Sequence, residues 1–140
     1  MPNLAVLLVV CLLAACSESY DRPLDPVWGK QPCAHCAMLV TEARYSAQLT
    51  TQDPERIWFD DIGCLIAYIA DRKPKVAHLW VHDAVTPRWL DATATRYQDG
   101  AKTPMDFGFV AGAKDGVDFA TMQRTVLARM SAKDHALDHH

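Results

Sequence analysis

An apolar segment at the N-terminus limits how much of this chain can fold as a globular domain. Residues 1–15, MPNLAVLLVVCLLAA, contain no charged side chain, and the run from Leu4 to Ala15 is almost entirely apolar. A helix that spans a bilayer needs about 20 apolar residues, so this run is too short. Its length and its small final residues instead predict a secretory signal peptide, although no Lys or Arg precedes the apolar run.

A cysteine follows the apolar segment directly. Leu13-Ala14-Ala15-Cys16 resembles the lipobox of bacterial lipoproteins, in which a signal peptidase cuts before a cysteine that then carries the lipid. Acyl chains bind a bilayer because each buried CH₂ group contributes about 0.8 kcal/mol. We therefore expect a lipid anchor at Cys16. Ser17 after it resembles the pattern for sorting to the outer membrane, so the protein is expected to face the periplasm.

The 125 residues that remain after cleavage (140 minus 15) are enough for one domain or for two small units with a shared core. Half of the residues are hydrophobic and the formal net charge is −3, which predicts a globular chain and no binding to nucleic acid. We expect a linker at residues 16–28, a folded domain at 29–131 and a flexible, histidine-rich tail at 132–140.

Strand-like and helix-like segments alternate along the folded part. Strand composition occurs at residues 37–51, 55–61, 76–85, 88–98 and 105–113, and helical spacing at 60–73 and 115–130. Strand, strand, helix and strand are followed by strand, strand and helix, and this order indicates an internal ββα repeat.

Local signals define the two helices. Asp60 or Asp61 can cap the first helix, and Pro74 lies beyond its end. The second helix is expected to be capped near Asp115, and its apolar positions are Phe119, Met122, Val126, Leu127 and Met130. In the strand at 76–85, alternation predicts His78, Trp80 and His82 on one face.

The number of cysteines indicates that one thiol has a special role. Cys11 belongs to the signal segment and Cys16 to the lipid anchor, so Cys33, Cys36 and Cys64 remain. A disulfide framework in an oxidising compartment needs an even number. At least one of the three thiols is therefore expected to be free or bound to a ligand.

Two of these cysteines lie in the segment PCAHCAM, residues 32–38, whose chemistry has several interpretations. Cys33 and Cys36 could form a redox dithiol, a plain disulfide, or half of a zinc site completed by His78 and His82. Met38 adds a further option. If a strand begins at Cys36, residues 36 and 38 point from the same face, and a thiolate beside a thioether suits Cu(I).

Four blocks of sequence resemble the NosL family, the lipoprotein accessory factors of nitrous oxide reductase. They are PCAHCAMLV, WFDDIGCLIAYI, LWVHDAVTPRWLDATATRY and TPMDFGFVAGA, and the resemblance runs from about Gly29 to Met130. The more specific parts are the Cys-x-x-Cys-x-Met block, the pattern from Asp83 to Asp91-Ala92, and the pair Pro104-Met105. Ala37 stands where the family usually has glycine.

The resemblance implies a copper chaperone rather than an enzyme. It implies delivery of Cu(I) to the copper–sulfide centre of nitrous oxide reductase, beside an ABC-transporter-like complex. It also implies an α+β fold of two small ββα(β) units that share a core, similar to part of organomercurial lyase, which agrees with the repeat. Carried over to this chain, the expected copper donors are Cys36, Met38 and Met105, with Cys33 as a further candidate. The donor role of Met105 requires its turn to fold back towards the first strand.

Two enzyme hypotheses compete with this interpretation. One is a thiol enzyme similar to organomercurial lyase, with Cys33, Cys36 and Cys64 as thiolates and Asp60 or Asp61 as proton donor. The other is a thiol–disulfide oxidoreductase that uses Cys33 and Cys36.

Other polar or reactive residues are expected to have structural roles. Cys64 lies inside the first helix, where free cysteine usually behaves as a small buried hydrophobe. Asp83 and Asp91 are expected to cap turns.

Overall fold

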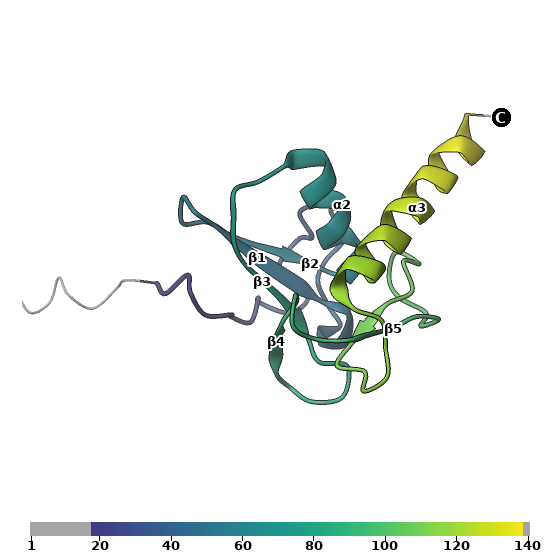
Figure 1. The fold of residues 1–140 in the computed structure, drawn as a ribbon. Coiled ribbons are helices and arrows are strands. Elements are labelled where there is room, and N and C mark those ends of the chain that lie inside the picture. The colour runs from purple at the N-terminus through teal and green to yellow at the C-terminus, as the bar shows by residue number, and fades with distance from the viewer. Residues whose placement is uncertain (1–17, 139–140) are drawn as a thin grey trace, which may run out of the picture.

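The computed structural model describes residues 18–138, which form a mixed α and β structure (Figure 1). The predicted signal peptide and Cys16 lie outside these residues. In chain order the elements are η1 (Ala43–Tyr45), β1 (Ala47–Thr51), β2 (Arg56–Phe59), α2 (Ile62–Arg72), β3 (Val76–His82), β4 (Trp89–Asp91), β5 (Tyr97–Gln98), β6 (Val110–Ala111) and α3 (Phe119–Leu137). The α+β class predicted from the sequence is confirmed.

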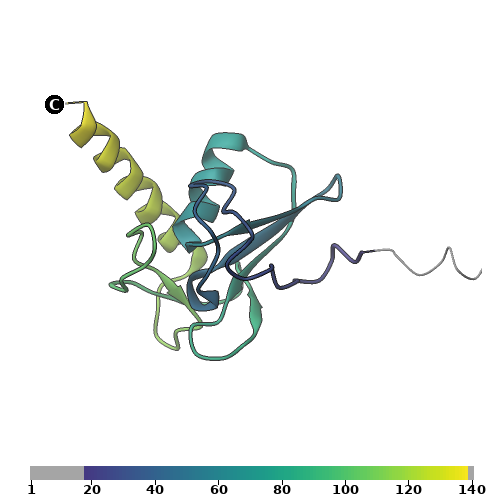
Figure 2. The ribbon, with the colours of Figure 1, turned by 180° about the vertical axis from the view of Figure 1, so that it is seen from behind.

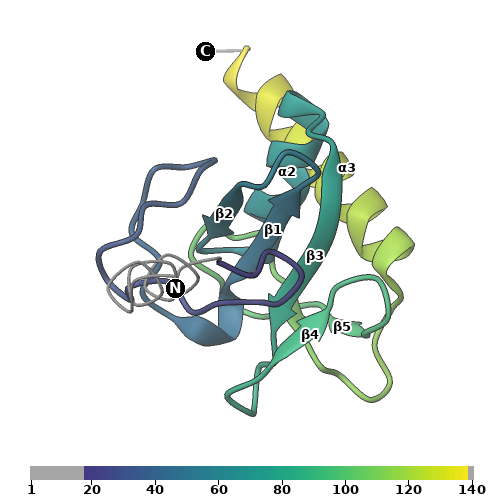
Figure 3. The ribbon, with the colours of Figure 1, turned by 90° about the vertical axis from the view of Figure 1, so that its left-hand side faces the viewer.

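The main sheet has four antiparallel strands in the order β2-β1-β3-β4 (Figure 3). β1 lies inside this sheet, where Leu49 is paired with Ile57 of β2 on one side and with Leu79 of β3 on the other. β5 and β6 pair with each other in a second, two-stranded sheet. Since β2 pairs with a strand on one side only, its other edge is open to bind a loop.

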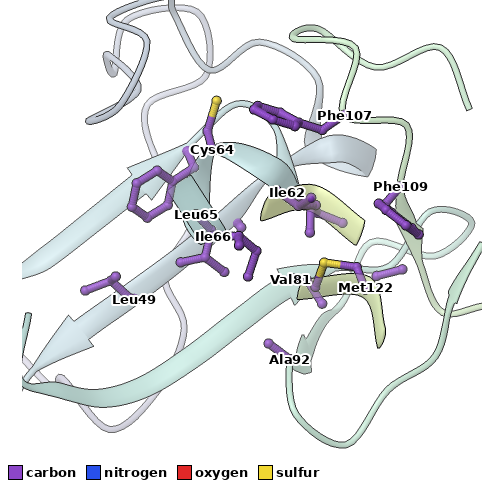
Figure 4. Packing of buried hydrophobic residues seen from close by; sticks show 14 of the residues in the cluster. Leu49, Ile62, Cys64, Leu65, Ile66, Val81, Ala92, Phe107, Phe109 and Met122 are labelled. Atoms are coloured by element: carbon purple, nitrogen blue, oxygen red, sulfur yellow. The ribbon is translucent and has the colours of Figure 1, made fainter. Parts of the chain in front are cut away.

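The core lies between the main sheet and the two helices. α2 packs against β1, β2 and α3. Leu49, Leu65, Val81 and Met122 are fully buried there, and Figure 4 shows them among the surrounding apolar side chains. Burial of one such side chain contributes about 1.5–3 kcal/mol to the free energy of unfolding. This core therefore holds the sheet and the two helices together.

The N-terminal segment covers the other face of the sheet (Figure 2). The amide of Gln48 on β1 forms hydrogen bonds of 3.0 Å with both the main-chain N–H and the carbonyl of Leu24. The Thr50 hydroxyl donates to the Tyr20 carbonyl at 2.9 Å. These bonds allow polar side chains of a central strand to be buried. The segment expected to be a linker is therefore bound to the sheet from Tyr20 onward.

Both helices occur where the sequence predicted them, with changes at their ends. Asp61 caps α2, because its carboxylate accepts a 2.8 Å bond from the N–H of Gly63. α3 is capped by Asp118 rather than near Asp115, since Asp118 accepts from the N–H of Thr121 at 2.8 Å.

α3 is also longer than the sequence indicated, and its last turns project beyond the sheet (Figure 1). It continues past Met130 to Leu137 because residues 131–137 include good helix formers and no Gly or Pro. Leu127, expected on the apolar stripe, is 37% exposed. No helix among residues 18–138 is both long and apolar enough to cross a membrane.

The predicted strands of the second half are much shorter than expected. Residues 88–98 form β4 and β5 with a turn between them, and of residues 105–113 only Val110–Ala111 is a strand. The turn begins at Asp91, whose carboxylate accepts from the N–H and the hydroxyl of Thr93. Asp83 accepts from the N–H groups of Val85 and Thr86. The prediction that these two aspartates cap turns is confirmed.

Candidate metal centre

Residues 33–38 form a tight loop, not the strand that the sequence suggested. The N–H of Cys33 donates to the carbonyl of Met38 at 2.7 Å, and the N–H of Ala37 donates to the carbonyl of Cys33 at 3.0 Å. Ala37 has a positive φ of 65°. The prediction of a strand that begins at Cys36, with Cys36 and Met38 on one face, is therefore wrong, because hydrogen bonds within the loop reverse the chain there.

The loop is bound to the open edge of the main sheet. The N–H of Ala34 donates to the carbonyl of Trp58 in β2 at 3.1 Å, and Pro32 and Leu39 form an isolated bridge at the base of the loop. β2 ends at Phe59 and α2 begins at Ile62. This edge contact brings the loop next to the residues that join β2 to α2.

Four side chains meet at this position, and we call them the cysteine cluster: Cys33, Cys36, Asp60 and Cys64. One donor atom from each lies within 4.8 Å of all the others. All three cysteines are free thiols. Cys33, Cys64 and Asp60 are buried, whereas Cys36 is only partly covered, so the cluster is open to solvent on the Cys36 side. In Figure 4 the sulfur of Cys64 points away from the other labelled core residues of α2.

Only one of the two oxygen atoms of the Asp60 carboxylate has a hydrogen-bond partner among the described residues. The thiol of Cys36 donates to its Oδ1 atom at 3.2 Å. The Oδ2 atom is buried and has no hydrogen-bond partner among the described residues. An unpaired buried acceptor costs about 1–3 kcal/mol or more, so a buried oxygen of this kind needs an explanation. A cation held by the cluster would supply the missing partner.

The three thiols differ in acidity. A hydrogen bond with the Cys64 thiol lowers the pKa of Cys33 to about 7, although burial opposes this effect. The same bond raises the pKa of Cys64, because Cys64 keeps the proton that it donates. Burial raises the pKa of Cys36 to about 12, and its bond to Asp60 acts in the same direction. Of the three thiols, Cys33 is therefore the one that loses its proton most readily, and a bound metal could deprotonate the other two.

The two predicted thioether donors, Met38 and Met105, are more exposed than the three buried members of the cysteine cluster. Met38 is 52% exposed on the outer end of the loop. Met105 is partly buried against the core, and its N–H donates to Oδ2 of Asp61 at 3.0 Å. Its turn is thus fixed to the start of α2 rather than to the first strand. Met105 lines a cavity of about 300 Å³ together with His35 of the loop and Met130 of α3.

The chain is similar to known proteins of one family. A model of the NosL family matches residues 25–135. The chain belongs to the NosL family. The crystal structure of the copper chaperone NosL from Shewanella denitrificans is similar to this NosL-family chain, with a TM-score of 0.53 and 17% identity, and the match covers 76% of this chain and 87% of that one. At this identity the likeness shows a shared fold. No curated protein sequence matches the chain.

The histidines of the zinc hypothesis do not join the cysteine cluster of this NosL-family chain. The ring of His78 stacks on Trp80 at 5.2 Å. His82 packs edge-on against Trp28 and Trp89, and its Nδ1 atom lies 2.9 Å from the carbonyl of Asp83. Both rings therefore pack against tryptophan side chains.

Cys64 lies in α2, the helix in which the sequence placed it. It is buried, as expected, but its sulfur belongs to the cysteine cluster and not only to the apolar core. A signal was present in the sequence, since Asp61 marks the start of a helix and Cys64 lies in its first turn. A residue in that turn lies close to the end of the preceding strand, where Asp60 is found.

Proposed function

We propose that this NosL-family chain is a metallochaperone that binds Cu(I) and passes it to another protein, and that it is not an enzyme. The observation that supports this most directly is the group of three free thiols within 4.8 Å, open to solvent at Cys36. Soft sulfur ligands select Cu(I) among the biological metals. The similar structure from Shewanella denitrificans is described as a copper chaperone.

The donors that we propose are the thiolates of Cys36 and Cys33, with Met38 and Met105 as thioethers. Cys36 is the thiol that solvent reaches, and Met38 follows it by two positions on the exposed side of the loop. Exposed donors suit delivery, because a partner protein can approach the ion and replace them one at a time. Met105 would close the site from the core side, where Asp61 holds its main chain.

The location and the recipient are also proposals. The lipobox at residues 13–16 supports a lipid anchor on Cys16 in the outer membrane, with the domain in the periplasm. Membership of the NosL family supports nitrous oxide reductase as the recipient, with its ABC-transporter-like maturation complex as a further partner.

The thiol-enzyme hypothesis uses the same cluster. Cys36 lies in hydrogen-bond contact with Asp60, a carboxyl group that could transfer a proton, and Cys33 and Cys64 lie beside them. Family membership and the two methionines near the loop favour the chaperone, because proton transfer does not need a thioether.

Anaerobic titration with Cu(I) against a chromophoric Cu(I) chelator tests the proposal. We expect one Cu(I) per chain. Cys36→Ser and Met38→Ala should each weaken binding by about tenfold or more, since both remove a soft donor. Met122→Leu removes a thioether from the closed core and should leave the affinity unchanged.

A transfer assay completes the test. Copper-loaded protein should give up its ion to metal-free nitrous oxide reductase, and the reductase should gain copper. Absence of a one-to-one Cu(I) complex, or the same affinity in Cys36→Ser and Met38→Ala as in the wild type, would contradict the chaperone function. Turnover of an organomercurial, or of a disulfide substrate, would support the enzyme instead.

A further inference from the structure

The segment of residues 18–28, which we call the strap, is part of the folded domain although it follows the lipobox almost directly. It lies across the face of the main sheet that the helices leave free (Figures 2 and 3). The main chain of Leu24 is bonded to the Gln48 amide of β1. Asp25 accepts from the indole N–H of Trp89 in β4 at 2.8 Å. A segment that is bound to two strands of a sheet is not a flexible linker.

The first residues of the strap enclose an arginine of β2. The side chain of Arg56 is only 3% exposed, and its guanidinium forms an ion pair with Glu18 at 3.4 Å. The guanidinium also donates to the main-chain carbonyl of Ser19 at 2.8 Å and lies 5.6 Å from the centre of the Tyr20 ring. Charge-assisted hydrogen bonds are stronger than bonds between neutral groups. The strap is therefore held firmly at the end that lies next to the lipobox.

The chain between the anchor and the strap is very short. Glu18 follows Cys16 by two positions. An extended chain spans at most about 3.6 Å per residue, so Cys16 lies within about 7 Å of Glu18 in any conformation. An unbound linker over residues 16–28 could instead extend to about 45 Å. The strap therefore fixes the point of the domain that lies nearest to the lipid.

This point lies at the end of the sheet that carries the turn between β1 and β2. Arg56 is the first residue of β2 and pairs with Thr50 of β1. In Figures 1 and 2 the turn and the start of the strap project from the same side of the domain, away from the last turns of α3. The cysteine cluster lies at the other end of β2, because Asp60 follows that strand, about 13 Å from Arg56.

We propose that the strap holds the domain end-on against the bilayer that its own anchor enters. The β1–β2 turn then contacts the lipid headgroups, and the cysteine cluster faces the aqueous compartment. This inference rests on the lipid anchor of the proposed function. The exposed residues of the turn include Asp53 and Glu55, and charged side chains enter hydrocarbon only at high cost, so the turn suits headgroups. A copper recipient would therefore reach Cys36 from the aqueous side, as a soluble protein or a soluble domain.

Two spin labels on the lipidated, full-length protein test this orientation. A nitroxide is attached through a ketone-bearing amino acid, which leaves the thiols free, at Asp53 of the turn or at Ala34 of the cysteine loop. Both positions are exposed. The protein is placed in vesicles of phosphatidylethanolamine and phosphatidylglycerol that contain a lipid with a gadolinium chelate on its headgroup. Relaxation enhancement falls steeply with distance, so it should be several-fold larger at position 53 than at position 34.

A longer tether provides the matched comparison. A flexible Gly/Ser segment of about ten residues inserted between Ser17 and Glu18 should make the enhancement at the two positions nearly equal, whereas the same segment added after His140 should not. Equal enhancement in the protein without an insertion, a larger effect at position 34, or a difference that survives the longer tether would overturn the orientation.

The proposed function can fail separately. A mass without acyl groups would reject the anchor together with this orientation, and the Cu(I) titration would still decide copper binding. Loss of copper binding in a chain with acyl groups and unequal labels would reject the chaperone and keep the orientation.

A measurement on the wild-type chain covers the case in which the labelled variants do not fold. Lys75 lies at the membrane end, where its carbonyl accepts from the N–H of Gln52 at 2.8 Å, and Lys133 lies on the last turns of α3. A membrane-impermeant reagent that acylates amines should modify Lys75 several-fold more slowly in vesicles than in detergent micelles. The rate at Lys133 should be the same in both. Equal protection of the two lysines, or protection of Lys133 alone, would overturn the orientation.

Discussion

The sulfur of Cys36 lies 3.2 Å from Oδ1 of Asp60, across 24 positions of the chain. This contact exists because a loop binds the open edge of β2 and because Asp60 follows that strand. The contact can therefore form only when the loop is bound to the edge of the sheet. Changes that move either one should alter both stability and metal binding.

The acidity of Cys33 predicts a rise in stability above neutral pH. The pKa of Cys33 is lowered to about 7 from its ordinary value of 9.0, first by the hydrogen bond with Cys64. Between these values the folded state holds fewer protons than the unfolded state, so the free energy of unfolding rises with pH, by about 1–3 kcal/mol. Urea unfolding of the reduced, metal-free protein between pH 7 and pH 9 measures this rise.

The sign reverses at higher pH. The pKa values of Cys36 and Cys64 are raised, so above their ordinary value of 9.0 the folded state keeps protons that the unfolded state loses, and stability falls. Cys33→Ser should remove the rising part of the profile and keep the falling part. A wild-type profile that is flat, or a rise that persists in Cys33→Ser, would contradict the assignment of the thiolate to Cys33.

Ala37→Gly should stabilise the loop. Ala37 has φ of 65°, a left-handed conformation that costs a residue with a Cβ atom about 1 kcal/mol or more relative to glycine. We expect the free energy of unfolding to increase by up to about 1 kcal/mol in thermal or urea denaturation. Ala34→Gly in the same loop is the matched control, and it should destabilise because Ala34 has no positive φ. Shifts of the same sign in both variants would argue against this explanation.

Gly63→Ala should destabilise the protein although alanine is the better helix former. Helix propensity alone would favour alanine by about 1 kcal/mol. A Cβ atom at position 63, however, would lie 2.0 Å from Cγ of Phe107, which is buried. Overpacking of this kind costs about 1–3 kcal/mol, so the net effect should be a loss. Urea unfolding decides the sign, and an increase in stability would show that the 103–109 segment can move away from α2.

Asp61→Ala should remove two interactions at once. One oxygen of Asp61 caps α2 through Gly63, and the other accepts from the N–H of Met105. Loss of a cap costs about 1 kcal/mol, and leaving the partly buried N–H of Met105 without its partner costs about 1–3 kcal/mol more. The free energy of unfolding should therefore fall by about 2–4 kcal/mol.

Asp118→Ala is the control for this change, because Asp118 caps α3 at an exposed position and its carboxylate accepts no hydrogen bond from a second loop among residues 18–138. It should cost only about 1 kcal/mol. Asp61→Ala should also weaken Cu(I) binding if Met105 is a donor, whereas Asp118→Ala should not. Equal losses of stability in the two variants would mean that the bond from Asp61 to Met105 contributes little.

Elements with strong local signals were predictable from the sequence. α2 begins after Asp61, buries Leu65 and Ile66 and ends before Pro74, as its capping and spacing indicated. The strand at 76–85 corresponds to β3. The loop at Cys33–Met38 was not predictable in this way, because its position depends on the hydrogen bond from Ala34 to Trp58, in an edge strand more than 20 positions away. Apolar residues such as Leu39 and Val40 beside it resembled a strand.

The sequence by itself determined the α+β class, the family and the number of thiols that remain in the folded part of the chain. These properties depend on local patterns, on motifs and on composition. Only the tertiary structure decided that Cys64 and Asp60 join Cys33 and Cys36, because the four donors come from a loop, a strand end and a helix. Their meeting depends on strand pairing and on the packing of α2, and contacts of this range leave no periodic pattern in the sequence.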